Sequence, residues 1–160
     1  MSKKTLVICL VFAVFALAGS VWLHYELPRI AVVKMTGVDS KRAESIITRS
    51  VNTTEKAPDV FFFFVEHENK QAAVYRNEDT GWGWPPYFKF NAADLQAKAQ
   101  GLIGQKVRIK YYGWRNKLWG LFPNVLDVEE AGSDPAMYSK TRIFFFSLWG
   151  VLLVLLFPRY

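Results

Sequence analysis

The chain is poor in the residues that most often form metal and redox sites, with one cysteine, Cys9, and two histidines, His24 and His67. A single cysteine has no partner for a disulfide within the chain, so the fold must be stable without one. Neither histidine has a cysteine or histidine companion at metal-ligand spacing, which excludes the common zinc sites. We therefore expect no metal and no cofactor, and we interpret Cys9 as a small apolar residue.

The sequence also lacks the motifs of the common enzyme families. No GxSxG, HExxH or GxxxxGK[ST] sequence occurs. The adjacent carboxylates of Glu78 and Asp79 could form half of a pair for glycan hydrolysis, but acidic residues in a turn more often cap backbone amides. We expect no catalytic residues, that is, a protein that is not an enzyme.

Two long apolar runs lie at the ends of the chain. The first, residues 5–23, carries no charge and as a helix would just span a hydrocarbon core of about 30 Å. Lys3 and Lys4 precede it, which predicts a cytoplasmic N-terminus, and Trp22 and Tyr25 suit the opposite interface. A cleaved signal peptide is the alternative, because small residues near the end of the run are typical of a cleavage site.

The second apolar run, residues 143–157, is shorter, at about 22 Å as a helix. It has no polar face, which favours lipid over a buried core position. A glycolipid-anchor signal beginning near Gly132 and Ser133 is an alternative. We expect this run to span the membrane too, so that both termini face the cytoplasm and the domain between the runs is periplasmic.

Between the runs, five segments have the alternating or continuous apolar pattern of strands: residues 29–36, 59–65, 71–76, 106–112 and 124–130. The second holds four consecutive phenylalanines and is apolar on both sides, so we expect a central strand covered on both faces. Asn91 is expected to cap a helix over residues 94–102. One helix between the third and fourth of five strands is the chain order of an OB-type barrel.

The predicted fold class is membrane-anchored α+β, mainly β: a small OB-like five-stranded barrel or sheet with one helix, flanked by an N-terminal and a C-terminal transmembrane helix. The expected domains are an anchor over residues 1–25, an extracytoplasmic β-rich domain over 26–134 and a transmembrane helix over 135–160. We expect linkers at residues 26–28 and 132–139. Most of the net charge of +6 comes from basic residues beside the apolar runs, so we expect no nucleic-acid partner.

Two aromatic segments, residues 76–90 and 111–124, hold four of the six tryptophans. Glycines and prolines around Trp82 and Trp84 predict a stiff loop. Rigid rings with charges nearby suit a partner protein, a glycan or a lipid, so the candidate partner-binding residues are Arg76, Asp79, Trp82, Trp84, Tyr87, Trp114 and Arg115. The alternative is that the rings cover the end of the barrel or pack at the membrane interface.

Three strings carry a family resemblance: YRNEDTGWGWPPYFKF at residues 75–90, DLQAKAQ at 94–100, and YYGWR followed by FPN. They are too long and too rich in tryptophan to recur by chance. On these strings, and over nearly its whole length, the chain resembles a bacterial uncharacterised membrane-protein family, domain of unknown function 1523. The resemblance implies a bacterial inner-membrane protein with no established activity.

Two functional hypotheses follow. The first is a non-enzymatic accessory subunit or modulator of a larger inner-membrane complex, which docks through its transmembrane helices and its periplasmic β domain. The second is an envelope binding module that recognises peptidoglycan or lipid through the loop of Trp82 and Trp84. The expected partners are membrane lipid and a membrane protein complex.

Overall fold

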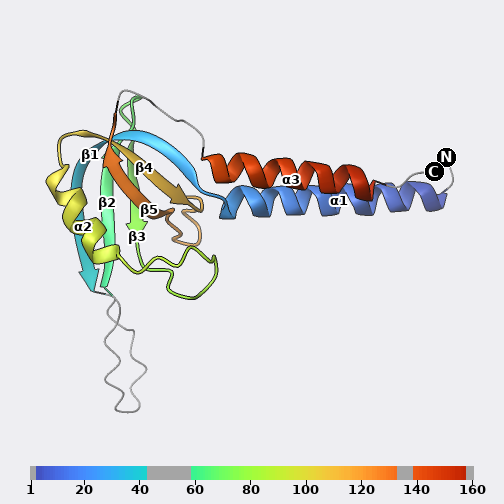
Figure 1. Cartoon of the computed structure of the whole chain (residues 1–160), viewed down its shortest axis with the longest axis horizontal. Helices are drawn as coiled ribbons and strands as arrows, with labels where there is room; N and C mark the ends of the chain where they lie inside the picture. Colours follow the sequence, from blue (N-terminus) through green and yellow to red (C-terminus); the bar gives the residue numbers. More distant parts are fainter. Residues whose placement is uncertain (1–2, 43–58, 133–138, 158–160) are drawn as a thin grey trace, which may run out of the picture.

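The computed structural model describes residues 3–42, 59–132 and 139–157. Figure 1 shows a domain of strands at one end and two long helices that leave it side by side. The elements in chain order are α1 (Lys3–Glu26), β1 (Arg29–Arg42), β2 (Asp59–Glu66), β3 (Ala72–Asn77), α2 (Ala92–Gly101), β4 (Lys106–Tyr112), β5 (Asn124–Glu130) and α3 (Lys140–Leu156). Residues 43–58, between β1 and β2, lie outside the described residues.

The five strands form a closed barrel in the order β1-β2-β3-β5-β4. Strand β1 is long enough to pair with β4 through residues 29–34 and with β2 through residues 34–42. An irregularity between Met35 and Gly37 lies where β1 passes from one partner to the other. A single parallel pairing of β3 with β5 closes the mixed sheet. The OB-like barrel expected from the order of elements is confirmed.

The barrel interior is filled by aliphatic and aromatic side chains, and α2 covers one end of it. Leu95 and Ala99 lie on one face of α2 and are buried, as their spacing of four residues predicts. The buried cluster consists of Val33, Met35, Phe63, Val65, Tyr75, Leu95, Ala99, Leu102, Val107, Ile109, Val125 and Val128.

Strand β2 alternates instead of being buried on both faces. Phe63 and Val65 are buried in the core, whereas Phe64 is 38% exposed. The expectation of a strand covered on both sides is wrong, because a barrel strand turns one face inward and the other outward. Phe62 is only partly covered, through an edge contact with the ring of Phe122 at 5.5 Å.

The residues between α1 and β1 are not a flexible linker. The backbone N–H of Leu27 continues the helical pattern by donating to the carbonyl of Leu23 at 2.9 Å. Leu27 and Pro28 are buried, and β1 begins immediately afterwards. The linker expected at residues 26–28 lies where α1 passes into β1, but burial and a continued hydrogen bond fix this junction. Most of the other expected linker, residues 133–138, lies outside the described residues.

One described helix, α1, is long and apolar enough to cross a membrane. A signal sequence near an N-terminus would have the same properties. Helix α3 has 17 residues, about 26 Å of helix against a hydrocarbon core of about 30 Å. By length and composition the described chain thus holds one candidate span, not the expected two.

The two helices pack through one stripe of residues each. The less exposed positions of α1 include Cys9, Phe12, Ala16, Gly19 and Ser20, and those of α3 are Arg142, Phe146, Trp149 and Leu153. These spacings of three and four residues are typical of a paired helix.

Gly19 brings the backbone of α1 close to Trp149. A Cβ atom at Gly19 would lie 2.3 Å from Cζ2 of that indole, closer than real atoms approach. The indole Nε1 of Trp149 donates to Oγ of Ser20 at 3.0 Å, and that hydroxyl donates to the carbonyl of Ala16 at 2.7 Å. Small residues and a side-chain hydrogen bond are what apolar helices use to associate in lipid.

Candidate functional site

The first aromatic loop, residues 78–91, packs against the end of α1 that meets the barrel. The ring of Trp84 stacks on the ring of Trp22, with centroids 5.8 Å apart and planes 12° apart. The indole Nε1 of Trp84 donates to Oε1 of Glu26 at 3.2 Å. Trp84 is thereby tied to α1 by one stacking contact and one hydrogen bond.

Tyr87 makes a second connection between this loop and α1. Its hydroxyl donates to the backbone carbonyl of Glu26, and its ring lies 5.0 Å from the ring of Tyr112. Burial raises the pKa of the Tyr87 phenol well above its ordinary value, and the nearby carboxylate of Glu26 adds to the effect. The hydroxyl therefore stays protonated and remains a donor.

The second aromatic loop, residues 113–123, meets the same end of α1. The indole Nε1 of Trp114 donates to Nδ1 of His24 at 3.0 Å, and its ring meets the ring of Tyr25 edge-on at 5.4 Å. The N–H of Gly113 donates to the carbonyl of Tyr25 at 2.9 Å. Gly113 has a φ of +83°, which favours glycine at this contact.

A buried lysine fixes the first aromatic loop to the barrel. Lys89 is 5% exposed. Its Nζ donates to Oδ1 of Asn77, to the carbonyl of Val125 at 2.6 Å and to the carbonyl of Glu78 at 3.3 Å. Burial lowers the pKa of Lys89 to about 8, although nearby carboxylates oppose the shift. All three acceptors are neutral, so Lys89 holds the loop through hydrogen bonds at an electrostatic cost.

Three of the charged residues proposed for partner binding contact their own chain. Nη2 of Arg76 pairs with Oε2 of Glu78 at 3.1 Å. Asp79 Oδ1 accepts a hydrogen bond from the N–H of Ala92 at 2.8 Å and so caps α2. Asn91 occupies the expected N-cap position, but its side chain makes no capping bond, so the side-chain cap comes from Asp79, earlier in the same loop.

Arg115 is the third of these charged residues. Its guanidinium lies 3.9 Å from the centroid of the Phe122 ring, and its Nη1 donates to the carbonyl of Leu121 at 2.8 Å. The structure therefore brings Trp84, Tyr87 and Trp114 together around the end of α1. It places Arg76, Asp79 and Arg115 in separate local contacts.

The sequence of this chain matches a known protein family. The family model described as "Protein of unknown function (DUF1523)" matches residues 3–159. The chain belongs to this family. A Haemophilus influenzae protein described only as an uncharacterized protein is 39% identical over 116 residues, which cover 70% of this chain and 67% of that protein.

Two solved structures are similar in part. The first is a Salmonella typhi PltB homopentamer with Neu5Ac-alpha-2-3-Gal-beta-1-4-GlcNAc glycans, with a TM-score of 0.43, 13% identity, and coverage of 67% of this chain and 86% of that one. The second comes from the subtilase cytotoxin SubAB assembly, with a TM-score of 0.43, 12% identity, and coverage of 70% and 93%. Similarity at this level carries no argument about function.

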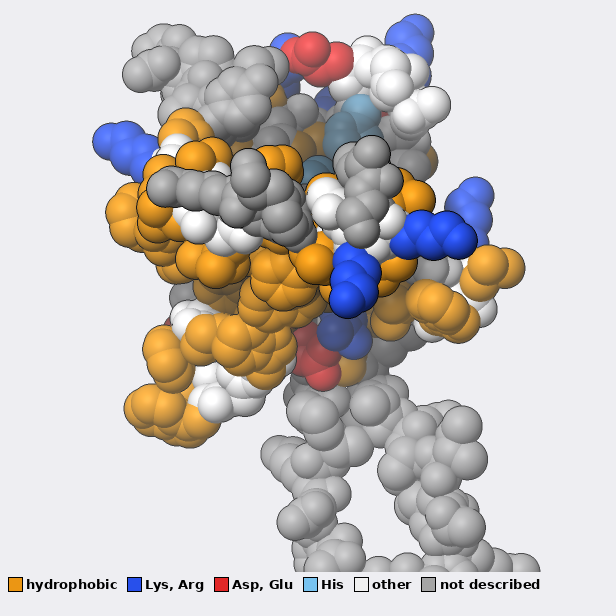
Figure 2. All heavy atoms as spheres, turned by 90° about the vertical axis from the view of Figure 1, so that its right-hand side faces the viewer, with side chains coloured by type: hydrophobic (Ala, Val, Ile, Leu, Met, Phe, Trp, Pro, Cys, Tyr) orange, Lys and Arg blue, Asp and Glu red, His pale blue; other side chains and the backbone are white. Residues whose placement is uncertain are grey.

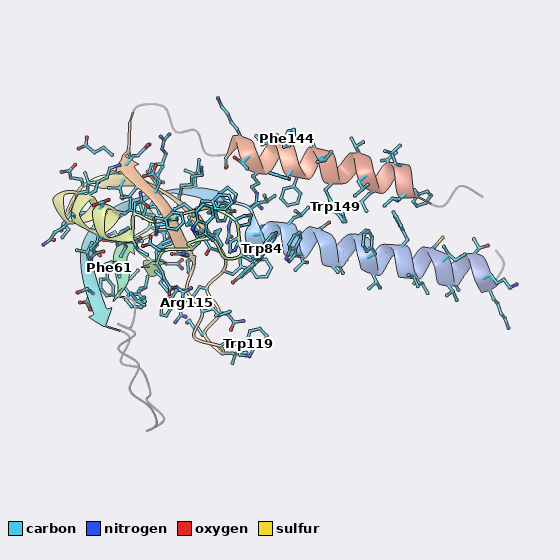
Figure 3. All side chains as sticks on the ribbon, turned by 60° about the horizontal axis from the view of Figure 1, so that its bottom comes forward. Phe61, Trp84, Arg115, Trp119, Phe144 and Trp149 are labelled. Atoms are coloured by element: carbon cyan, nitrogen blue, oxygen red, sulfur yellow. The ribbon has the colours of Figure 1, made fainter. Side chains whose placement is uncertain are left out.

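Several large apolar side chains of the two aromatic loops stay exposed. Trp82 is 83% exposed, and its ring lies 5.5 Å from both Phe88 and Phe90, which are about half exposed. At the tip of the second loop Leu118 is 92% and Trp119 76% exposed. Figure 3 shows Trp84 against the barrel end of α1 and Trp119 at the tip of its loop on the same side of the barrel.

Of the exposed rings of the two loops, the sequence-based set includes Trp82, Trp84 and Trp114 and misses Phe88, Phe90 and Trp119. Their residue type could have indicated their exposure, because large apolar residues in segments without strand or helix periodicity have no buried face to occupy. Figure 2, viewed along the helices, shows the hydrophobic side chains of the helices nearest the viewer and separate hydrophobic lobes to either side of them, with Lys and Arg side chains among and around them.

A cleft of about 460 Å³ lies beside the second aromatic loop. Its charged lining is basic and includes Arg29, Arg115 and Lys117, whereas no carboxylate lines it. The aromatic part of its lining includes Tyr75 and Tyr111. Within the part of the chain that the structure describes, no group of three or more His, Cys, Asp or Glu side chains comes together as a metal site. The chemistry of this cleft suits an anion.

Proposed function

We propose that this member of the DUF1523 family is a non-enzymatic accessory subunit of a larger inner-membrane complex. In this proposal α1 and α3 both span the membrane, both termini are cytoplasmic and the barrel is periplasmic. The observation that carries it is the rigid attachment of the barrel to α1. Four side chains or backbone groups of residues 24–26 are hydrogen-bonded to the two aromatic loops.

A rigid attachment is what a subunit of fixed geometry requires. A partner that docks on α1 then also determines where the barrel stands, because α1 continues into β1 through the buried residues Leu27 and Pro28. An envelope module that searches for peptidoglycan would gain from a flexible tether. Of its two predicted rings, Trp84 is held against α1 by stacking on Trp22 although it is 66% exposed, whereas Trp82 is 83% exposed and makes no contact with α1 among the described ring contacts.

The packing of α3 supports a second span in spite of its length. No residue of α3 is buried, and its sequence is apolar on all sides after the first turn. In water such a helix would expose a continuous hydrocarbon surface, which soluble proteins avoid. Its contacts with α1 run from Trp149 near Ser20 to Phe157 against Phe12. A short span of this kind is accommodated by local thinning of the bilayer.

The outer faces of the two helices are available for docking. On α1, Val7, Val14 and Val21 lie opposite the stripe that meets α3 and are 57%, 66% and 46% exposed. On α3, Phe144, Val151 and Leu155 are the corresponding positions. Without a partner these faces contact lipid.

The test is site-specific photo-crosslinking in native membranes. A photo-reactive phenylalanine analogue at Val14 should give one discrete adduct with a membrane protein, and the same protein should be captured from Val151. At Ala16, which faces α3, the analogue should react within the chain and serves as the matched control.

Rigidity is tested by inserting four Gly and Ser residues between Pro28 and Arg29. The insertion should leave the barrel folded by circular dichroism and should abolish stoichiometric co-purification of the crosslinked protein. If Val14 and Val151 give only lipid adducts, or if the insertion leaves co-purification unchanged, the accessory-subunit proposal fails.

A further inference from the structure

The exposed apolar side chains of the two aromatic loops form two groups near the barrel end of α1. They are Trp82, Phe88 and Phe90 in the first loop and Leu118 and Trp119 in the second, each at least half exposed, and we name the two groups together the aromatic platform. Scattered exposed apolar residues are ordinary, but a gathered group of large ones marks an interaction surface. The position of the aromatic platform relative to α1 determines which partner it contacts.

The platform lies level with the last turns of the apolar helix. Trp84 stacks on Trp22, and Trp22 precedes the end of α1 at Glu26 by about 6 Å along the helix axis. The first aromatic loop therefore reaches back along α1 to the end of its uncharged run. Figure 1 shows α2 on the opposite side of the barrel from the helices. Tryptophan is enriched at this depth in membrane proteins, where its amphipathic ring meets the headgroup layer.

The basic cleft opens beside the same surface. Lys117, which lines the cleft, immediately precedes Leu118 in the second aromatic loop. Arg29, another lining residue, follows α1 by three positions and donates to the carbonyl of Gly113. Among the described residues, Arg29, Arg115 and Lys117 form no ion pair with a carboxylate. Basic groups next to an apolar tip match the order of phosphate and acyl chain in a phospholipid.

We propose that the barrel rests on the outer leaflet of the inner membrane. The aromatic platform enters the interfacial layer, and the basic cleft holds the phosphate of a phospholipid headgroup. The occupant is the bilayer lipid itself. The inference rests on the membrane anchoring by α1 that the proposed function includes, but it needs no protein partner.

Depth measurements in nanodiscs test the platform. The full-length chain with Cys9→Ser receives one cysteine at a time, labelled with a fluorophore that nitroxide lipids quench. Leu118→Cys and Trp82→Cys should be quenched by headgroup-proximal nitroxides at least threefold more than Lys98→Cys, the control on α2. Val14→Cys should be quenched by nitroxides deep in the acyl chains and reports the anchor separately.

The labels at Val14 and Leu118 distinguish a failure of the platform inference from a failure of the proposed function. If Val14→Cys is quenched and Leu118→Cys matches Lys98→Cys, the barrel stands off the membrane and the inference is overturned while the anchor stands. If Val14→Cys is not quenched either, α1 does not span and the proposed function fails with it.

Headgroup binding is tested with a fluorescent phosphatidylglycerol and detergent-solubilised protein. A charge near the membrane surface contributes about fivefold to anionic-lipid affinity, so Lys117→Ser should weaken binding about fivefold, whereas Lys98→Ser should not change it. Equal losses from the two variants would overturn the cleft assignment. Inorganic phosphate that displaces the lipid at equal concentration would also overturn it and assign a site for the free ion.

Discussion

Replacing Gly19 by alanine tests the contact on which the helix pair depends. The added Cβ would lie 2.3 Å from Cζ2 and 2.6 Å from Cη2 of Trp149, so the helices must separate or the indole must rotate. Overpacking of this kind costs about 1–3 kcal/mol. Either movement also strains the bond from Trp149 to Ser20, and side-chain hydrogen bonds between membrane helices are worth about 0.6–1.7 kcal/mol.

Alanine also favours helix over glycine by about 1 kcal/mol, which opposes these losses. We therefore expect Gly19→Ala to reduce the stability of the helix pair by about 1–4 kcal/mol. Gly150→Ala is the matched control, because a Cβ at Gly150 on α3 meets nothing within 4 Å. It should be neutral or stabilising by up to about 1 kcal/mol.

The assay is reversible unfolding of the solubilised protein by titration with a denaturing detergent, followed by helical circular dichroism. Crosslinking of cysteines at Phe12 and Phe157, whose rings lie 5.6 Å apart, in the Cys9→Ser background reports the pairing directly. In a Trp149→Phe background the smaller ring should remove most of the cost of Gly19→Ala. Equal costs in both backgrounds, or equal effects of Gly19→Ala and Gly150→Ala, would refute the proposed contact.

Three further predictions concern the barrel and can be checked by thermal or chemical unfolding. Phe63→Ala should cost about 3–5 kcal/mol because Phe63 is buried, and Phe64→Ala should cost less than about 1 kcal/mol; equal costs would contradict the alternation of β2. Asp79→Ala should cost about 1 kcal/mol through loss of the α2 cap, and an unchanged stability would show that the bond to Ala92 contributes nothing. Because the pKa of Lys89 is about 8 in the folded chain and about 10.4 unfolded, the unfolded chain binds more protons between these values, so stability should rise by about 1 kcal/mol from about pH 7.5 to about 9. The rise should be absent in Lys89→Met and in Lys89→Arg, and a rise that persists in both would assign it to another group.

The sequence by itself determined the elements whose pattern is local. The uncharged run of residues 5–23 predicts α1, and the alternation in residues 106–112 predicts β4 with Val107 and Ile109 inward, as the structure has them. The order of five strands and one helix predicted the OB-like barrel, although several other small α+β sheets share that order, and only the strand pairing shows that the barrel is closed. The tryptophan-rich strings were enough for the family.

Only the tertiary structure decided which side of each apolar segment is covered. The phenylalanines of β2 look alike in sequence, but closure of the barrel buries Phe63 and exposes Phe64. Trp82 and Trp84 differ by two positions, but Trp84 stacks on Trp22, which lies far away in the chain, whereas Trp82 contacts Phe88 and Phe90 of its own loop. Lys89 gave no sequence signal, because its acceptors come from β3, β5 and the loop between β3 and α2. The spacing of apolar residues indicates only the helix or strand to which a residue belongs. The contacts described here join distant segments, which meet only when the barrel closes on the end of α1.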